Sequence, residues 1–223
     1  MGLKGFLSQT EPFQHLPSEA LREIAHVATE KVYPKEAVIF REGEPATSLW
    51  VLQSGWVQLV KLSLDGKTLT LDLVTPQDGV CGLSAFSGHT YLASAIAATP
   101  VKALQIPSKM VRRFLKSHPQ FSACVMGIFS HRFHHMAAAY ANAYAPVEQR
   151  VASVLLRLDE DFGTTLPVTR REIANLAGTT VETAIRVTNQ MRRENLLLMR
   201  RGQIILVSPR GLTKKLNQEV KKL

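Results

Sequence analysis

An acidic and a basic side chain, Glu182 and Arg186, lie four residues apart in a segment with helical periodicity, so they would share one helix face. A carboxylate can accept a hydrogen bond from cytosine N4, and a guanidinium can donate two to guanine O6 and N7. The surrounding region is basic, with 12 Lys and Arg residues against 4 Asp and Glu residues from Phe162 onward. Each cation placed near a phosphate releases condensed counterions. These residue types predict non-covalent recognition of a polyanion.

Two short helices joined by a tight turn are predicted around this pair. Thr169 with Glu172 has the spacing of a capping box, and so does Thr179 with Glu182, which predicts a helix start at each threonine. Gly178 lies between the two helices and permits the break in helical conformation. This pattern is typical of a helix-turn-helix, whose second helix can lie in the major groove of DNA.

A basic hairpin is predicted after the second helix. Two apolar runs, 196–199 and 204–207, enclose Arg200, Arg201, Gly202 and Gln203. Apolar runs on both sides of a glycine-containing turn are typical of a β-hairpin. A hairpin at this place in the chain would form the wing of a winged helix-turn-helix.

The N-terminal half has a different periodicity. A short helix is predicted over residues 17–30, after which short apolar or alternating runs are separated by turn residues. Asp65-Gly66 is a two-residue hairpin signal, because glycine tolerates the positive φ of a tight turn. Many short strands at this spacing predict a sandwich or a barrel. The predicted strands cover residues 38–40, 49–52, 56–62, 69–74, 93–98 and 101–106.

Helical periodicity returns after Pro107, with a short helix over residues 108–116 and a long one over 119–144. Along the long helix, apolar residues recur at alternating gaps of three and four, as in a coiled coil. We predict that this seam forms a homodimer; the alternative is that the helix packs on its own β domain. The seam residues are Met126, Phe129, Phe133, Met136 and Tyr140.

Composition excludes several classes of protein. The chain has 223 residues, of which 45% are hydrophobic, and it contains neither an apolar run of 18 residues nor a secretory signal. We therefore expect a cytoplasmic protein that does not contact membranes. Its two cysteines, Cys81 and Cys124, lack the spacing of a zinc or iron–sulfur site, so no metal site is predicted. No P-loop, dinucleotide motif or nucleophile–base constellation is present, and an enzyme is not expected.

Three segments, IFREGEPATSLWVLQSGWVQL, VTRREIANLAGTTVETAIRVTNQMRRENLL and RRGQIILV, together resemble the CRP/FNR superfamily of bacterial transcription regulators, and the resemblance covers nearly the whole chain. It implies an α+β fold with a cyclic-nucleotide-binding-like β-roll (a jelly roll) over residues 1–116. A long dimerisation helix over 117–145 and a C-terminal winged helix-turn-helix over 146–223 would follow. The implied function is sequence-specific regulation by a homodimer on palindromic double-stranded DNA, with RNA polymerase as a further partner if the protein activates.

The resemblance places Glu182 and Arg186, together with their neighbours Val181 and Ile185, at base-reading positions. The chain departs from the superfamily at Val181, where CRP-type members have arginine, and at Ile185, where FNR-type members have serine, so the outer bases of the half-site are open. The alternatives are that Glu182 only caps its helix and that Arg186 binds phosphate. Phosphate contacts, which position a protein without specifying sequence, are predicted at Arg170, Thr179, Thr180 and Arg201.

Superfamily members that bind cyclic nucleotide use a Gly-Glu pair for the ribose hydroxyl and an Arg-Ser or Arg-Thr pair for the phosphate. The matching positions are Gly82-Leu83 and Ala93-Ser94, so both charged members are missing, and Met136 stands where cyclic-AMP binders have a polar residue. A buried phosphodiester without a charge partner is costly. We predict an effector pocket at these residues and no tight response to cyclic AMP.

Other effectors stay open at this point. Haem is one alternative, which would make the protein a gas or redox sensor, with ligands drawn from Cys81, His89, His131, His134 and His135. A metal shared by His131 and His135, a thiol signal at Cys81 or Cys124, a small organic effector and no effector are the others. The alternative functions are a small-molecule-binding module that regulates a protein partner and a non-specific architectural DNA protein.

Overall fold

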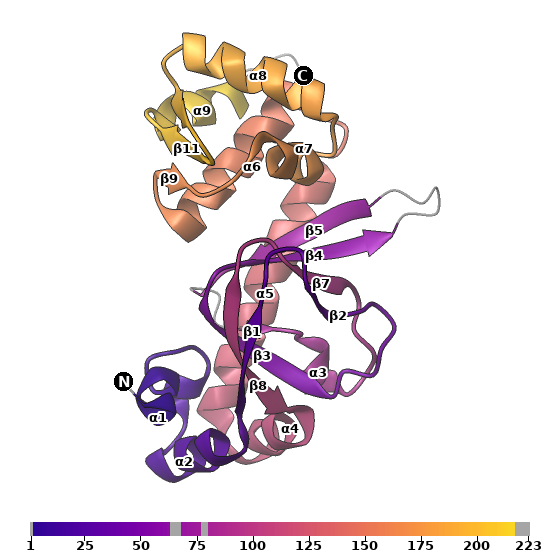
Figure 1. Ribbon diagram of the computed structural model, residues 1–223, viewed down its shortest axis with the longest axis vertical. Coiled ribbons are helices and arrows are strands. Elements are labelled where there is room, and N and C mark those ends of the chain that lie inside the picture. The colour runs from indigo at the N-terminus through magenta and orange to yellow at the C-terminus, as the bar shows by residue number, and fades with distance from the viewer. Residues whose placement is uncertain (1, 63–67, 77–79, 217–223) are drawn as a thin grey trace. The chain divides into compact units, whose positions relative to one another are not determined.

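The computed structural model describes residues 2–62, 68–76 and 80–216. The chain divides into two compact units, Met1–Met136 and Ala137–Leu223. The first is a β-roll with helices packed against it, and the second combines short helices with a three-stranded sheet, which confirms the predicted α+β fold (Figure 1). No helix within the described ranges is both long and apolar enough to cross a membrane.

Two antiparallel four-stranded sheets form the β-roll. All six predicted strands are present, with ends shifted by at most two residues. The sequence does not predict β1, which is charged and exposed, or β6, which has two residues. The predicted turn at Asp65-Gly66 lies outside the described residues. In spatial order the sheets are β1 (Thr29–Tyr33), β8 (Val101–Pro107), β3 (Ser48–Ser54) and β6 (Val80–Cys81), and β2 (Val38–Phe40), β7 (Ser94–Ala97), β4 (Val57–Leu62) and β5 (Thr68–Val74).

The helix predicted over residues 17–30 is too long. Helix α2 covers Ser18–Val27, and Thr29 already pairs with Gln105 of β8. A residue distant in the chain stabilises the strand, because Glu30 forms an ion pair with Lys102 of β8 at 3.0 Å. Pairing with a distant strand therefore overrides the local helical period at this point.

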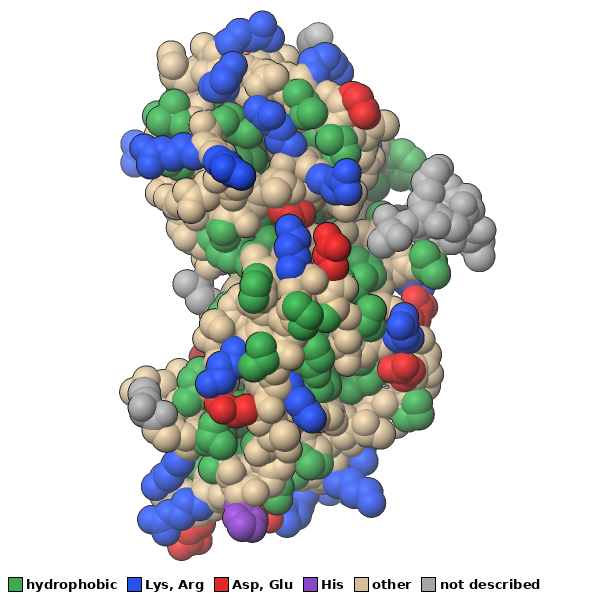
Figure 2. Space-filling view, viewed as in Figure 1, with side chains coloured by type: hydrophobic (Ala, Val, Ile, Leu, Met, Phe, Trp, Pro, Cys, Tyr) green, Lys and Arg blue, Asp and Glu red, His purple; other side chains and the backbone are tan. Residues whose placement is uncertain are grey.

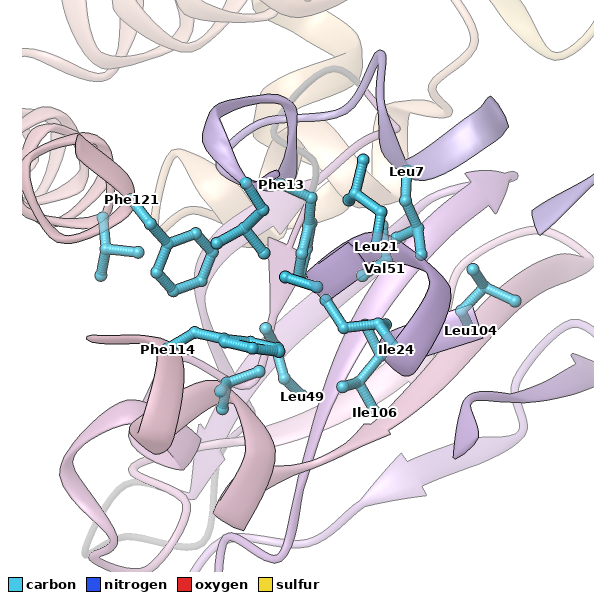
Figure 3. Close-up of a cluster of buried hydrophobic side chains, with 14 of the residues drawn as sticks. Leu7, Phe13, Leu21, Ile24, Leu49, Val51, Leu104, Ile106, Phe114 and Phe121 are labelled. Atoms are coloured by element: carbon cyan, nitrogen blue, oxygen red, sulfur yellow. The ribbon is translucent and has the colours of Figure 1, made fainter. Parts of the chain in front are cut away.

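The main core of the first unit lies between the sheet that contains β3 and β8 and the helices α1 (Leu3–Leu7), α2, α4 (Ser108–Ser117) and α5 (Pro119–Ala141). A short helix, α3 (Ser84–Ser87), contributes Phe86. Phe13, from the 3-10 helix Phe13–His15, and Phe121 of α5 are fully buried, with ring centroids 5.8 Å apart. Figure 3 shows both rings pointing into this cluster. The contact ties the N-terminal segment to α5.

Helix α5 has a buried face and an exposed apolar face. Phe121 and Val125 are buried against the β-roll. The predicted seam lies on another face, and its exposed fractions are 67% for Met126, 38% for Phe129, 70% for Phe133, 54% for Met136 and 77% for Tyr140. The helix ends at Ala141 rather than at the predicted residue 144, and the Ala143 N–H donates to the Tyr140 carbonyl at 3.0 Å in the tighter turn that follows.

Helix α6 (Val147–Phe162) is the scaffold of the second unit, against which α7 (Arg170–Leu176), α8 (Val181–Arg193) and α9 (Pro209–Leu216) pack. The predicted hairpin is present, with β10 (Leu197–Arg200) antiparallel to β11 (Gln203–Leu206) and β9 (Thr165–Leu166) on the other side of β11. Gly202 has a φ of 71° in the hairpin turn. The buried side chains include Val151, Leu155, Leu158, Ile173, Met191 and Leu212.

The turn between α7 and α8 corrects one prediction. The capping box of Thr169 and Glu172 is present, but the N-cap of α8 is Thr180 rather than Thr179. Gly178 adopts a φ of 58°, and the Thr179 N–H donates to the Ala174 carbonyl at 2.9 Å, as in a Schellman motif. Thr179 therefore belongs to the end of α7, which moves the start of α8 by one residue.

This geometry predicts different effects for the two neighbouring threonines. The Thr180 hydroxyl accepts from the Thr183 N–H at 3.2 Å, and loss of such a cap costs about 1 kcal/mol. We expect Thr180→Ala to speed amide hydrogen exchange through local opening of α8 by about fivefold. Thr179→Ala keeps the backbone N–H that closes the turn and is the matched control. Equal effects of the two substitutions would contradict the assigned cap.

One lysine joins three helices of the second unit. Lys215 of α9 forms ion pairs with Glu148 of α6 and with Glu194, at 2.7 Å for the latter, just after α8. Burial alone would lower the pKa of Lys215, but its hydrogen bonds to Glu148 and Glu194 raise it. The same contact lowers the pKa of Glu194. These ion pairs hold the C-terminal end of α8 against the scaffold.

Candidate nucleic-acid interface and effector pocket

Helix α8 is anchored by one face and leaves the opposite face open. Ala184, Val187 and Met191 are buried, and the buried Thr188 hydroxyl donates to the Ala184 carbonyl at 2.7 Å. Helices α7 and α8 are joined by the tight turn and lie side by side (Figure 1). Because the apolar residues recur at helical spacing, the remaining side chains point away from the domain.

Glu182 lies in the first turn of α8 and is fully exposed. Its own backbone N–H is the main cause that lowers the pKa of its carboxyl group, and the Thr180 side chain adds to this effect. The carboxylate is therefore ionised at neutral pH and can only accept hydrogen bonds. It supports the helix start and is also positioned to accept from an external donor such as cytosine N4.

Arg186 is exposed one helical turn beyond Glu182 and makes no hydrogen bond or ion pair with any residue in the described ranges. Its guanidinium carries five N–H donors in a planar fork, which matches the two acceptors of a guanine edge. Val181 and Ile185 precede the two charged residues directly and are half-buried. Glu182 and Arg186 are thus more exposed than the two apolar residues beside them.

A groove runs between the start of α7, the middle of α8 and the hairpin. Ile185 lines it from α8, and four arginines that are exposed or half-exposed border it. Figure 2 shows several Lys and Arg side chains spread over the visible face of this unit. The polar and charged residues that line the groove are Thr169, Arg170, Arg171, Arg200, Arg201 and Gln203.

The predicted phosphate contacts occupy different environments. Arg201 is exposed in the hairpin turn, Thr179 lies in the turn that ends α7, and Thr180 caps the start of α8. Arg170 is half-buried and donates to Asn189 Oδ1 at 3.3 Å, so it also holds α7 against α8. Arg171, which is exposed in the first turn of α7, was not predicted as a phosphate contact. Its place beside Arg170, two residues after the Thr169 cap, was the available indication.

Aromatic rings fill the interior of the β-roll beside Gly82. Tyr91 is 4% exposed and stacks on Phe40, with ring centroids 3.8 Å apart. The Tyr91 hydroxyl donates to the Ser48 carbonyl at 2.7 Å and accepts from the Ser48 N–H at 3.3 Å. Burial raises the pKa of Tyr91. A Cβ atom on Gly82 would lie 3.2 Å from the Tyr91 ring, so Gly82 permits this close packing.

The structure distributes the other predicted pocket residues over several environments. Ala93 is buried, and the Ser94 hydroxyl accepts from the Glu42 N–H at 2.9 Å. Leu83 packs against the main core of the first unit, whereas Met136 is on the exposed seam of α5. Leu83, Ala93 and Ser94 are therefore part of the packing of the first unit, whereas Met136 is not.

The candidate haem ligands are placed as follows. Cys81 is fully buried in the core of the β-roll, whereas His89 is exposed. On α5, His131 and His135 contact each other with their Nε2 atoms 3.0 Å apart, and His134 is exposed. The burial of Cys81 favours a packing role for its side chain.

Comparisons with known proteins agree with this anatomy. Residues 30–118 match the model of the cyclic nucleotide-binding domain, and residues 149–215 match the Crp-like helix-turn-helix domain. The chain is 26% identical over 211 residues to a CRP-like cAMP-activated global transcriptional regulator of Mycobacterium tuberculosis, covering 91% of this chain and 94% of that protein. It is 26% identical over 222 residues to a global nitrogen regulator of Synechocystis, covering 93% and 96%.

Solved structures show the same fold. The structure of FixK2 from Bradyrhizobium japonicum matches with a TM-score of 0.77 and 24% identity, covering 84% of this chain and 96% of that one. An exposed reading helix and a wing, in a chain that also has a β-roll, define a DNA-binding transcription regulator. The chain belongs to the CRP/FNR superfamily of transcription regulators.

Proposed function

We propose that this regulator binds a palindromic DNA site as a homodimer and reads it with Glu182 and Arg186. The observation that carries the proposal is the exposed, ionised pair one helical turn apart on α8, whose buried face is fixed by the domain. In this arrangement residues 1–116 form the sensor-like domain, 117–145 the dimerisation helix and 146–223 the DNA-binding domain. Two α8 helices would enter successive major grooves about 34 Å apart.

The exposed apolar seam of α5 supports the dimer. Large side chains that are more than half exposed, such as Phe133 and Tyr140, follow one helix face at coiled-coil spacing. Contact with the β-roll is made by Phe121 and Val125, which lie on another face of α5. A second copy of α5 is the partner whose pattern matches the seam. The wing, α7 and α8 would hold phosphates through Arg171, Arg201, Thr179 and Thr180. If the bound dimer activates, RNA polymerase is its further partner.

Selection of DNA from a random pool by the purified protein, at a stated salt concentration, tests this function. We expect the native protein to select an inverted repeat whose half-site contains a G·C pair. The Arg186→Ala protein should select sites that lack this pair as readily as sites that have it. Recovery of sequences without a shared motif would favour the non-specific architectural alternative. Absence of any salt-dependent DNA binding would favour a module that regulates a protein partner.

We also propose that cyclic AMP is not the effector. Leu83 and Ala93 stand where a ribose-binding carboxylate and a phosphate-binding guanidinium would be needed, and Phe40 and Tyr91 occupy the adjoining interior. A phosphodiester buried there would have no charge partner from these positions. The Mycobacterium tuberculosis relative is named as cAMP-activated, so it serves as the positive control for cyclic AMP binding.

Calorimetric titration of cyclic AMP into the tag-free protein is expected to give no saturable heat up to about 1 mM, which limits any binding free energy to about 4 kcal/mol. The Mycobacterium tuberculosis relative, titrated in the same buffer, controls for the quality of the ligand. Saturable binding at micromolar concentration would refute this part of the proposal.

A further inference from the structure

Three potential metal ligands of different chemistry converge on the surface of the first unit. Glu11 and His15 flank Phe13 in the N-terminal segment, and Cys124 lies on α5, more than 100 residues away in sequence. A carboxylate oxygen, an imidazole nitrogen and the Cys124 Sγ all lie within 4.8 Å of one another. Glu11 and His15 are exposed and Cys124 is half-buried, so a dissolved ion can reach all three.

The backbone that carries these side chains is fixed by the core. Phe13 lies between Glu11 and His15 and packs against Phe121, which is about one helical turn before Cys124 on α5 (Figure 3). The turn is closed by the Leu16 N–H, which donates to the Phe13 carbonyl at 2.9 Å. A rigid framework of this kind holds ligands near a common point without loss of much conformational entropy on binding.

Polar contacts already link the three side chains through one neighbour. Gln14 Nε2 donates to Glu11 Oε1 at 3.2 Å and lies 3.4 Å from His15 Nε2. The Cys124 thiol is hydrogen-bonded to Glu11. These contacts hold the carboxylate, the imidazole and the thiol next to one another before any ion binds.

We propose that Glu11, His15 and Cys124 bind a borderline-soft divalent transition metal, with Zn²⁺ as the expected ion. A mixed oxygen, nitrogen and sulfur donor set suits zinc, whereas magnesium and calcium require oxygen donors. Bonds of about 2.0–2.3 Å in a tetrahedral site place ligand atoms roughly 3.3–3.8 Å apart. Since the three atoms lie within 4.8 Å of one another, binding requires them to approach by about 1.5 Å at most. The fourth position takes water, and the thiol proton is released to solvent as the metal–sulfur bond forms.

The bound metal would clamp the N-terminal segment onto α5. This role is separate from DNA reading, which the proposed function assigns to the second unit. Sequence spacing does not reveal the site, because two ligands come from one segment and the third comes from a helix that only the folded core brings beside it. Binding can therefore be tested without reference to any DNA sequence.

Cobalt(II) titration of the tag-free, reduced and chelator-treated full-length protein tests the site. We expect a thiolate-to-cobalt charge-transfer absorption and visible d–d bands that saturate at one ion per chain and disappear when Zn²⁺ is added. Cys124→Ser should abolish the charge-transfer band. His15→Gln and Glu11→Gln should weaken zinc affinity by more than the roughly 10- to 100-fold that loss of a supporting group around a metal site costs.

Two substitutions elsewhere in the unit are matched controls. His26→Gln removes an exposed histidine of α2, and Cys81→Ala removes the buried cysteine of the β-roll; both should keep the band. Circular dichroism establishes that each variant is folded. Absence of a thiolate band in the native protein, or its persistence in Cys124→Ser, would overturn the proposal. Unchanged zinc affinity in His15→Gln would assign the ion to other donors, such as His131 and His135, and would also overturn it.

Discussion

Arg186→Ala is expected to abolish most of the preference of this regulator for its operator over scrambled DNA. A bidentate arginine–guanine pair contributes about 1–3 kcal/mol of discrimination, and a symmetric dimer would make two such pairs. The combined loss of about 2–6 kcal/mol corresponds to a roughly 30- to 25,000-fold weaker binding of the operator. Because Arg186 is exposed and makes no hydrogen bond or ion pair with the residues that the structure describes, the fold should be unaffected.

The measurement is a pair of binding isotherms, on the selected operator and on a scrambled duplex, over a range of salt concentrations. Arg201→Ala is the contrast, because Arg201 lies in the hairpin turn and is proposed to contact phosphate. Its loss should weaken binding to both duplexes alike and reduce the salt dependence of binding. If Arg186→Ala also weakened binding to both duplexes alike, Arg186 would be a phosphate contact and its proposed base-reading role would be wrong.

Phe133→Asp is expected to dissociate the proposed dimer. Phe133 is 70% exposed within one chain, so its replacement should cost the single subunit little. In the dimer, the carboxylate of each copy would be buried in an apolar seam without a charge partner. This burial costs several kcal/mol of association free energy per charge. Two charges in one seam raise the dimer dissociation constant by roughly 1000-fold or more.

Sedimentation velocity at micromolar protein concentration measures this effect. His134→Asp is the control, because His134 is also exposed on α5 but lies outside the apolar seam. We expect the His134 variant to sediment as the native protein does, and the Phe133 variant to sediment as a monomer with unchanged circular dichroism. A Phe133→Asp protein that kept the native sedimentation coefficient would contradict a dimer through this seam.

Local sequence patterns were sufficient for the reading domain. The Thr169–Glu172 capping box, the glycine of the turn and the basic hairpin each involve residues close together in the chain, so their physics is visible in the sequence. The cap was predicted at Thr179 because Glu182 completes the capping-box spacing from that residue, whereas Thr180 has a threonine, Thr183, at the corresponding position. The Schellman hydrogen bond to Ala174 decides between them, and it depends on how the preceding helix ends.

The amino-acid sequence by itself determined six strands of the β-roll, the helix-turn-helix with its hairpin, the charge of the C-terminal third and the chemistry of Glu182 and Arg186, because periodicity and capping act over a few residues. Only the tertiary structure decided what fills the β-roll and which side chains meet across it. Phe40 stacks on Tyr91, and Cys124 joins Glu11 and His15, because the burial of distant apolar residues brings their neighbours together. Such contacts have no periodicity along the chain, so no local pattern predicts them.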